Sequence, residues 1–206
     1  MKPNKCKLIT FLSLFLLFTG CQDQPLFVTG NDVGNPKLSG SFTHNVDTHV
    51  YKLTGAGTNM WADSDEFFMV WKEYTGDFTL SVRIAFEGEG VDPHRKMGLI
   101  IRESLDGDAV YADVAVHGDG LTSLQYRVEQ GAETQEVVSP NKAPDHILLQ
   151  RIGNRIVMKT AHGALPTEAD GEITLGLPSS CYVGLFICSH NPDVRETGCF
   201  SDVKMH

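Results

Sequence analysis

Polar and ionisable residues recur at every second position in three consecutive segments of this chain. The segments 96–102, 110–117 and 123–128 each alternate an apolar row with a polar one, a period of two that is typical of half-buried strands. Arg, Asp and Gln side chains form directional hydrogen bonds with hydroxyl groups, so such a face could bind a carbohydrate. If the three strands are neighbours, one sheet face carries Lys96, Arg102, Tyr111, Asp113, His117, Gln125 and Arg127.

Aromatic side chains would complete a sugar site, because a ring can stack on the C–H face of a sugar. Trp61 and Tyr111 are the candidate stacking platforms, although Trp61 and Trp71 could instead belong to the core. Arg83, on the polar side of another predicted strand, joins the candidate hydrogen-bonding residues. His190, at a predicted strand end, is a further candidate, with a structural role in a loop as the alternative.

The polar face also has a simpler explanation. One face of an antiparallel sandwich usually meets water, so polar alternation is expected there without any ligand, and its charged residues can pair across strands. We favour a ligand-binding groove because the face mixes Arg, Asp, His and Tyr rather than Lys, Glu and Thr.

The rest of the chain predicts the scaffold that would position this face. Short segments of alternating hydrophobicity follow one another, separated by turn sequences such as Gly153-Asn154, and long helical periodicity is missing. We therefore predict an all-β fold, a two-sheet antiparallel β-sandwich, in a single domain over 26–206. Besides the three segments above, strands are predicted at 49–54, 66–72, 77–86, 135–138, 146–152, 155–160, 181–189 and 198–205.

Several short motifs follow one another in an order that resembles a known family. They are Asn59-Met60-Trp61, Asp65-Glu66-Phe67, Gly76-Asp77-Phe78, the run over 96–102, Gly184-Leu185 with Ser189-His190, and Phe200-Ser201-Asp202-Val203. This order is similar to the concanavalin A-like jelly-roll domains of the "regulation of enolase protein 1" type, and to the β-sandwich appended to family 43 glycoside hydrolases. The resemblance covers nearly all of the chain after its N-terminal segment. It implies a jelly-roll fold and a frequent association with carbohydrate proteins, but no settled activity.

Three function classes fit these features. The first is non-catalytic binding of a poly- or oligosaccharide on the concave polar face, and it is our main hypothesis. The second is a glycoside hydrolase or related sugar-cleaving enzyme with Asp113 as an acid. Glycoside hydrolases usually need two facing carboxyl groups, and no Glu-x-Asp-x-x-Glu run occurs here. The third is a protein-interaction module of the cell envelope. Nucleophile-elbow, HExxH and P-loop patterns are absent.

The N-terminal segment predicts export. A short basic start precedes an apolar run over 8–18, which is too short to span a bilayer but has the charge order of a secretory signal. A small residue followed by Cys21 resembles a bacterial lipobox. We therefore expect a signal peptide over 1–20 and a lipidated Cys21 with a tether over 21–25, the alternative being an ordinary secretory signal. Gln22, in place of the Asp of an inner-membrane retention signal, favours the outer membrane.

The charge of the chain bears on its partners. The formal net charge of -9 at pH 7 argues against nucleic-acid binding, which needs a basic surface. An acidic domain also gains nothing from anionic lipid, so we expect membrane attachment through the lipid anchor only.

Cysteines and acidic residues leave two structural questions. Cys188 and Cys199 flank one loop and could form a disulfide, or these two and Cys181 could be small buried hydrophobes. We expect no cofactor, but sandwiches of this kind often carry a structural calcium held by acidic oxygens. The candidate ligands, none at EF-hand spacing, are Asp63, Asp65, Asp106, Asp108 and Asp202.

Overall fold

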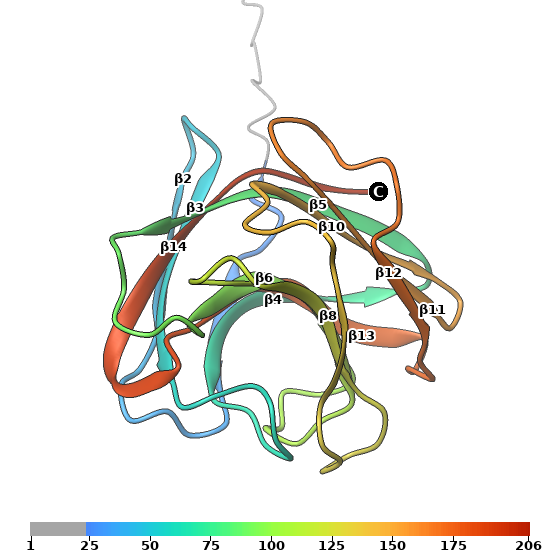
Figure 1. The fold of residues 1–206 in the computed structure, drawn as a ribbon, viewed down its shortest axis with the longest axis horizontal. Coiled ribbons are helices and arrows are strands. Elements are labelled where there is room, and N and C mark those ends of the chain that lie inside the picture. The colour runs from blue at the N-terminus through green and yellow to red at the C-terminus, as the bar shows by residue number, and fades with distance from the viewer. Residues whose placement is uncertain (1–23) are drawn as a thin grey trace, which may run out of the picture.

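The computed structural model describes residues 24–206, and these residues fold into fourteen β-strands without a helix. The strands form two antiparallel sheets that stack as curved layers (Figure 1). This arrangement confirms the predicted all-β, two-sheet sandwich. The predicted signal peptide and Cys21 lie outside the described residues.

Sheet A forms the inner layer of the curve in Figure 1. Its strand order is β1-β4-β13-β6-β7-β8-β9. The bounds are Thr29–Val33 for β1, Phe67–Thr75 for β4, Ser180–Cys188 for β13, Lys96–Arg102 for β6, Tyr111–His117 for β7, Thr122–Arg127 for β8 and Gln135–Val138 for β9.

Sheet B forms the outer layer, with the order β12-β11-β10-β5-β14-β3-β2. The bounds are Gly171–Thr174 for β12, Arg155–Ala161 for β11, His146–Ile152 for β10, Phe78–Glu87 for β5, Asn191–Met205 for β14, Val50–Gly57 for β3 and Ser41–Asn45 for β2.

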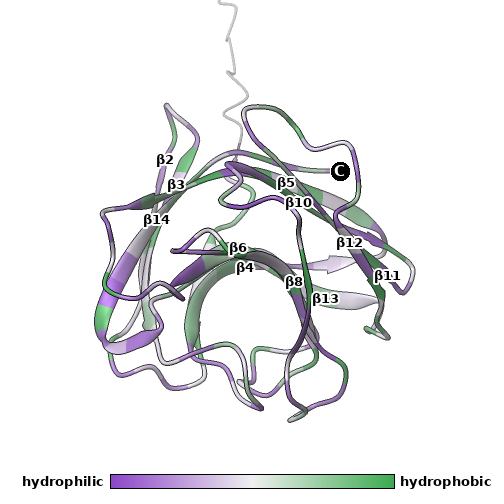
Figure 2. Ribbon diagram, viewed as in Figure 1, coloured by the Kyte–Doolittle hydropathy of each residue, from purple (hydrophilic) through white to green (hydrophobic). Residues whose placement is uncertain are grey.

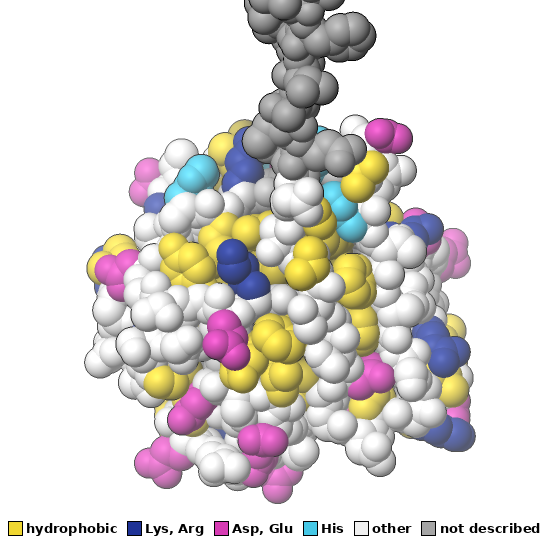
Figure 3. Space-filling model, turned by 180° about the vertical axis from the view of Figure 1, so that it is seen from behind, with side chains coloured by type: hydrophobic (Ala, Val, Ile, Leu, Met, Phe, Trp, Pro, Cys, Tyr) yellow, Lys and Arg dark blue, Asp and Glu magenta, His cyan; other side chains and the backbone are white. Residues whose placement is uncertain are grey.

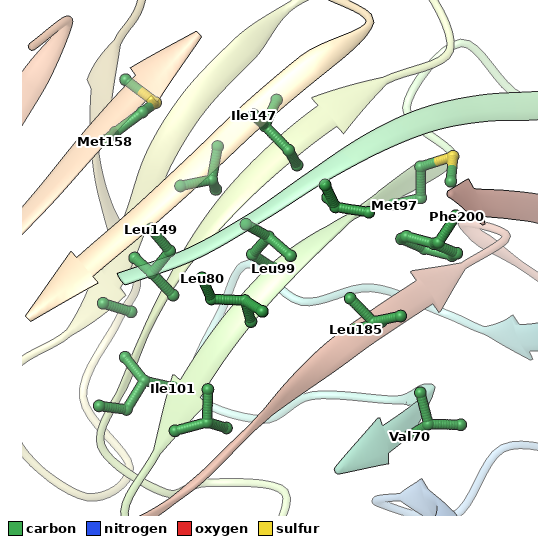
Figure 4. Packing of buried hydrophobic residues seen from close by; sticks show 14 of the residues in the cluster. Val70, Leu80, Met97, Leu99, Ile101, Ile147, Leu149, Met158, Leu185 and Phe200 are labelled. Atoms are coloured by element: carbon green, nitrogen blue, oxygen red, sulfur yellow. The ribbon is translucent and has the colours of Figure 1, made fainter. Parts of the chain in front are cut away.

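The main hydrophobic core lies between the sheets and is built from the apolar rows of the alternating segments. Leu80 of β5 and Leu149 of β10 come from sheet B, and Leu99 of β6 and Leu185 of β13 come from sheet A. All four side chains are buried in one cluster (Figure 4). Polar and apolar residues succeed one another along the strands (Figure 2), as expected when alternate side chains point to opposite faces.

Most of the strands follow the sequence pattern, and the exceptions lie at the edges. The segments predicted at 96–102, 135–138 and 146–152 coincide with β6, β9 and β10, and Gly153-Asn154 joins β10 to β11 as expected. By contrast, β1, β2 and β12 carry no clear signal. Each is an edge strand of four or five residues that are largely exposed or half-buried, and its inward face contributes too few apolar side chains to form a recognisable row.

Sheet A differs from the expected half-buried sheet because its second face is also largely buried and carries apolar as well as polar side chains. Its concave face, which is the face turned away from sheet B, carries a second cluster that includes Phe67, Met69, Ile100 and Phe186. Loop residues such as Met60 pack into this cluster from below. Every residue of β6 and β7 is consequently buried, and most of the concave face is closed rather than open to solvent.

The three described cysteines are free. Cys188 lies on sheet A, where its thiol donates to the carbonyl of Glu66 over 3.3 Å. Cys199 lies on sheet B, where its thiol donates to Glu87 over 3.3 Å. The Cys188–Cys199 bridge considered from the sequence does not form, because the two residues belong to different sheets.

No helix within residues 24–206 has the length and apolar character needed to cross a bilayer. On the face seen from behind, acidic and basic side chains are scattered among apolar and uncharged ones (Figure 3).

Candidate functional site

At one end of the concave face, a buried carboxylate joins two buried arginines. Arg127 forms a bidentate pair with Asp65, with Nη2–Oδ1 and Nη1–Oδ2 distances of 2.7 and 2.9 Å. Arg102 Nη1 lies 3.4 Å from Asp65 Oδ2. None of the three side chains is exposed. Bidentate guanidinium–carboxylate pairs are among the strongest charge-assisted hydrogen bonds, so this Asp65 cluster fixes the loop that carries Asp65.

The same arginines bind the backbone of the loops that cover the sheet. Arg127 donates to the carbonyls of Ala62 and Ala132 over 2.8 and 2.7 Å. Arg102 donates to the carbonyl of Ser104 over 2.7 Å. The two side chains thereby fasten three separate loops to β6 and β8, and the guanidinium groups face protein rather than solvent.

Tyr111 lies between the two arginines and is also fully buried. Its hydroxyl donates to the carbonyl of Met60 over 3.1 Å and lies 3.0 Å from the hydroxyl of Thr134. Burial raises the pKa of Tyr111 well above its usual value. Arg102, Tyr111 and Arg127 do share one sheet face as predicted, but the prediction that they contact a ligand is corrected here, because loops cover them completely.

Arg83 does not belong to the concave face. It lies on β5 of sheet B, where its side chain is 49% exposed and pairs with Asp145 over 3.0 Å. The polar row of β5 therefore points outward on the opposite sheet, and the inclusion of Arg83 in the sugar site is corrected.

The acidic candidates for calcium are mostly engaged by other side chains. Both carboxylate oxygens of Asp65 are taken by Arg127, while Asp106 accepts from Ser104 and Asp108 from Gln130. Within residues 24–206, no group of three or more His, Cys, Asp or Glu residues is arranged to hold a metal.

The other end of the concave face holds an open cavity of about 350 Å³, which we call the His–Lys pocket. It includes five of the residues predicted from the sequence, namely Trp61, Lys96, His117, Gln125 and His190. Its other lining residues are Asn59, His94, Leu121 and Glu136.

Strand register explains how the floor of the pocket is assembled. Lys96 begins β6 directly opposite His117, which ends β7. One step along the same face, Ala115 of β7 pairs with Ser123 of β8. These side chains are small, so Gln125 can reach back past them, and its Nε2 lies 3.1 Å from His117 Nε2 and 3.3 Å from Ser123 Oγ.

Loops form the rim. Trp61 and Asn59 come from the loop between β3 and β4, which the Asp65 cluster fastens, and the Trp61 side chain is 40% exposed. His94 and His190 come from two further loops, and their ring centroids lie 5.4 Å apart. The centroid of His94 also lies 5.9 Å from that of His117. Three imidazoles therefore line one side of the pocket.

Buried polar atoms without hydrogen-bond partners concentrate at this site. Seven such atoms occur in residues 24–206, and five of them belong to Asp113, His117, Gln125 and His190. Asp113 is the cross-strand neighbour of Gln125 on the same face. Buried polar groups are nearly always paired, so a local concentration of unpaired ones needs an explanation such as bound water or a ligand.

Burial favours the neutral forms of three titratable side chains at this end of the face, His117, His190 and Asp113. It lowers the pKa of His117 to about 3, with the charge of Lys96 adding to the effect, and it lowers the pKa of His190. It also raises the pKa of Asp113 well above its usual value, against the opposing effect of Lys96. Because the amide nitrogen of Gln125 can only donate, the neutral His117 ring accepts at Nε2 and carries its proton on the unpaired Nδ1.

Four lining residues, Asn59, His94, Leu121 and Glu136, were not predicted as site residues from the sequence. Asn59, His94 and Leu121 lie in loops or turns, where no periodicity places a side chain relative to the sheet. Glu136 lies on the edge strand β9, directly opposite Gln125. Only a prediction that β9 pairs with β8 could have placed Glu136 beside Gln125.

Comparison with known proteins identifies the fold. No family model matches the chain, and no curated protein matches it in sequence. A functionally unknown protein from Saccharomyces cerevisiae is similar in structure (TM-score 0.63, 14% identity, 86% of this chain and 95% of that one). The chain has the concanavalin A-like jelly-roll fold.

Two further solved structures place that fold among carbohydrate proteins. The lectin UEA-II, solved with galactose, has a TM-score of 0.54 at 8% identity over 86% of this chain and 96% of that one. The family 43 glycoside hydrolase protein BlXynB from Bacillus licheniformis has a TM-score of 0.54 at 10% identity over 85% of this chain. The match covers only 38% of that hydrolase chain.

The Asp65 cluster predicts a large, specific loss of stability. Replacing Asp65 by Asn leaves two buried guanidinium groups without a counter-charge, and we expect the free energy of unfolding to fall by about 3–5 kcal/mol. Asp63→Asn, an exposed change in the same loop, should stay within about 0.5 kcal/mol of wild type. Denaturant unfolding measures both, and equal stabilities of the two variants would contradict a structural role for the cluster.

His117 predicts a pH dependence. Its folded pKa of about 3 lies below the unfolded value of about 6.5, so only the unfolded state gains this proton as the pH falls between those values. The protein therefore loses stability below about pH 6.5, by up to about 1.4 kcal/mol per pH unit from this group.

Urea unfolding at several pH values tests this expectation. The His117→Gln variant should show a shallower loss of stability on acidification than wild type. His162→Gln, at an exposed position, provides the control and should follow wild type. Identical slopes for wild type and His117→Gln would show that His117 is not buried as a neutral base.

Proposed function

We propose that this protein binds carbohydrate without cleaving it, and that the His–Lys pocket is the binding site. The observation that carries the proposal is the group of unpaired buried polar atoms at the floor of a pocket with a half-exposed tryptophan on its rim. Ligand pockets commonly combine apolar walls with a few convergent polar groups in this way.

The chemistry of the unpaired atoms suits sugar hydroxyls. A hydroxyl both donates and accepts hydrogen bonds, so one hydroxyl could accept from His117 Nδ1–H while another donates to Gln125 Oε1. Trp61 supplies a ring surface for the C–H face of a sugar. The lectin with the same fold, solved with galactose, supports the choice of ligand class.

The position of the carboxyl groups favours binding over hydrolysis. Glycoside hydrolases usually place an acid and a second carboxylate on either side of the scissile bond. Here Asp113 is fully buried and does not line the pocket, whereas Glu136 lies exposed on its rim. We therefore propose that incubation with bound oligosaccharides releases no new reducing ends.

Trp61 provides the direct test. We expect Trp61→Ala to weaken oligosaccharide binding about three- to tenfold, which corresponds to the loss of one aromatic stacking contact. Calorimetric titration of the full chain against a panel of oligosaccharides measures this change. Trp71→Phe, outside the pocket, is the matched control and should bind as wild type does.

Two outcomes would contradict the proposal. If no glycan binds, while a single protein partner is captured in stoichiometric amounts, the protein-interaction module becomes the better hypothesis. If reducing ends accumulate and Asp113→Asn abolishes their release without abolishing binding, the protein is a glycoside hydrolase.

We also propose that the protein is an exported lipoprotein of the "regulation of enolase protein 1" type, anchored to the outer membrane. The order of the motifs from Asn59 to Val203 supports the family, and the basic start, apolar run and Cys21 support the anchor. The polysaccharide would then be bound at the membrane surface.

Cys21 predicts where the protein is found. Cys21→Ser should abolish incorporation of labelled fatty acid, because the thiol that would carry the lipid is removed. Cys199→Ser, which alters a half-exposed cysteine of the folded domain, should leave labelling intact. Labelling of Cys21→Ser at the wild-type level, measured after expression in a bacterial host, would contradict the lipid anchor.

A further inference from the structure

Lys96 is the exception among the buried cations of this protein. Three of the buried arginines pair with carboxylates: Arg102 and Arg127 with Asp65, and Arg95 with Glu196 over 2.7 Å. The fourth, Arg151, donates to two backbone carbonyls. Lys96 is only 2% exposed.

The contacts of Lys96 leave its charge uncompensated. It makes a single hydrogen bond within the described residues, to Asn59 Oδ1 over 3.3 Å. A buried charge is normally paired or fully hydrogen-bonded, because desolvation is otherwise costly. The ammonium of Lys96 therefore has capacity for a further, negatively charged partner.

The groups beside Lys96 do not supply that negative charge. Burial raises the pKa of Asp113 well above its usual value, and it raises the pKa of the Cys188 thiol, on the adjacent strand, to about 11. His117 and His190 are neutral, and no carboxylate oxygen in residues 24–206 lies within ion-pair distance of Lys96 Nζ. Glu136, the one acidic lining residue, is exposed on the rim.

The composition of the pocket distinguishes between kinds of anion. One ammonium and one imidazole N–H can hold a single carboxylate. The floor also presents an unpaired acceptor, Gln125 Oε1, which a bare anion could not use but a hydroxyl could. The forked guanidinium groups that suit phosphate are committed elsewhere, in the Asp65 cluster. A ligand with one carboxylate, several hydroxyls and an apolar ring face matches these groups.

We propose, building on the carbohydrate-binding function above, that the His–Lys pocket selects an acidic sugar and that Lys96 binds its carboxylate. The carboxylate lies against the Lys96 ammonium and the His117 Nδ1–H. The ring hydroxyls reach Gln125 and Asn59, and Trp61 covers the ring. The ligand class is a uronic acid residue, at the end of a chain or within it.

Matched ligands test the selection directly. The full chain in mild detergent is titrated with tri-galacturonic acid, with its methyl ester and with galactotriose, which share a ring stereochemistry and differ in the group at C6. We expect the acid to bind at least about tenfold more tightly than either neutral ligand, the gain expected when one charged hydrogen-bonded pair is formed. Added salt should weaken binding of the acid alone.

Variants at Lys96 test the assignment. Lys96→Met keeps the length of the side chain and removes the charge, and it should abolish the preference for the acid while binding of galactotriose changes less than about threefold. Lys52→Met, on sheet B and paired with Glu87, is the control and should retain the preference. The comparison of the three ligands on the wild-type protein does not depend on how well Lys96→Met folds.

The outcomes separate this inference from the proposed function. Equal binding of acid, ester and galactotriose, all weakened by Trp61→Ala, would overturn the acidic-sugar assignment and leave carbohydrate binding in place. Competition by inorganic phosphate at the same concentration as the acid would show a bare anion site and would also overturn it. Absence of binding by any sugar would overturn both.

Discussion

The carboxylate of Asp65 is the interaction on which the architecture of the concave face depends. It brings a loop between β3 and β4 down onto sheet A and neutralises two arginines that would otherwise be buried without a counter-charge. A buried ion pair is stabilising only when geometry and additional hydrogen bonds repay desolvation. Here the remaining donors of Arg102 and Arg127 are taken by loop carbonyls, so the cluster meets that condition and closes three loops at once.

The Asp65 cluster at one end of the concave face also positions the rim of the His–Lys pocket at the other end. The loop held by Asp65 carries Trp61 and Asn59, and the backbone of Trp61 is tied down in addition by Thr134, whose N–H donates to its carbonyl over 3.1 Å. The rim of the pocket is thus positioned by groups that no ligand needs to touch. Arg102, Tyr111 and Arg127 position the rim by fixing the loop, and a change at any of them would disturb the pocket through Trp61.

The fold and about half of the residues that line the pocket could be predicted from the sequence. Period-two alternation placed the core rows of β5, β6 and β7 and predicted that seven polar residues would share a face, and they do. It could not reveal the edge strands β1, β2 and β12, because these short strands are largely exposed or half-buried and carry too few apolar residues to form a row. It also assigned Arg83 to the wrong sheet. An odd or even position in the alternation tells on which face of its strand a residue lies, but not which sheet contains that strand.

The alternating pattern also does not show which loops cover a row of polar side chains. For this reason it could not separate the predicted site residues that are covered by loops from those that line the pocket. Lys96 and Arg102 are six residues apart on the same face of one strand, and both are buried. Arg102 meets a carboxylate because a loop of the protein brings Asp65 to it, whereas Lys96 meets one amide oxygen. The alternation is identical at the two positions. The two cations differ because the loops bring a carboxylate to Arg102 but not to Lys96. An internal carboxylate therefore neutralises the cations at the first end of the face, whereas no carboxylate of residues 24–206 pairs with the cation at the second end.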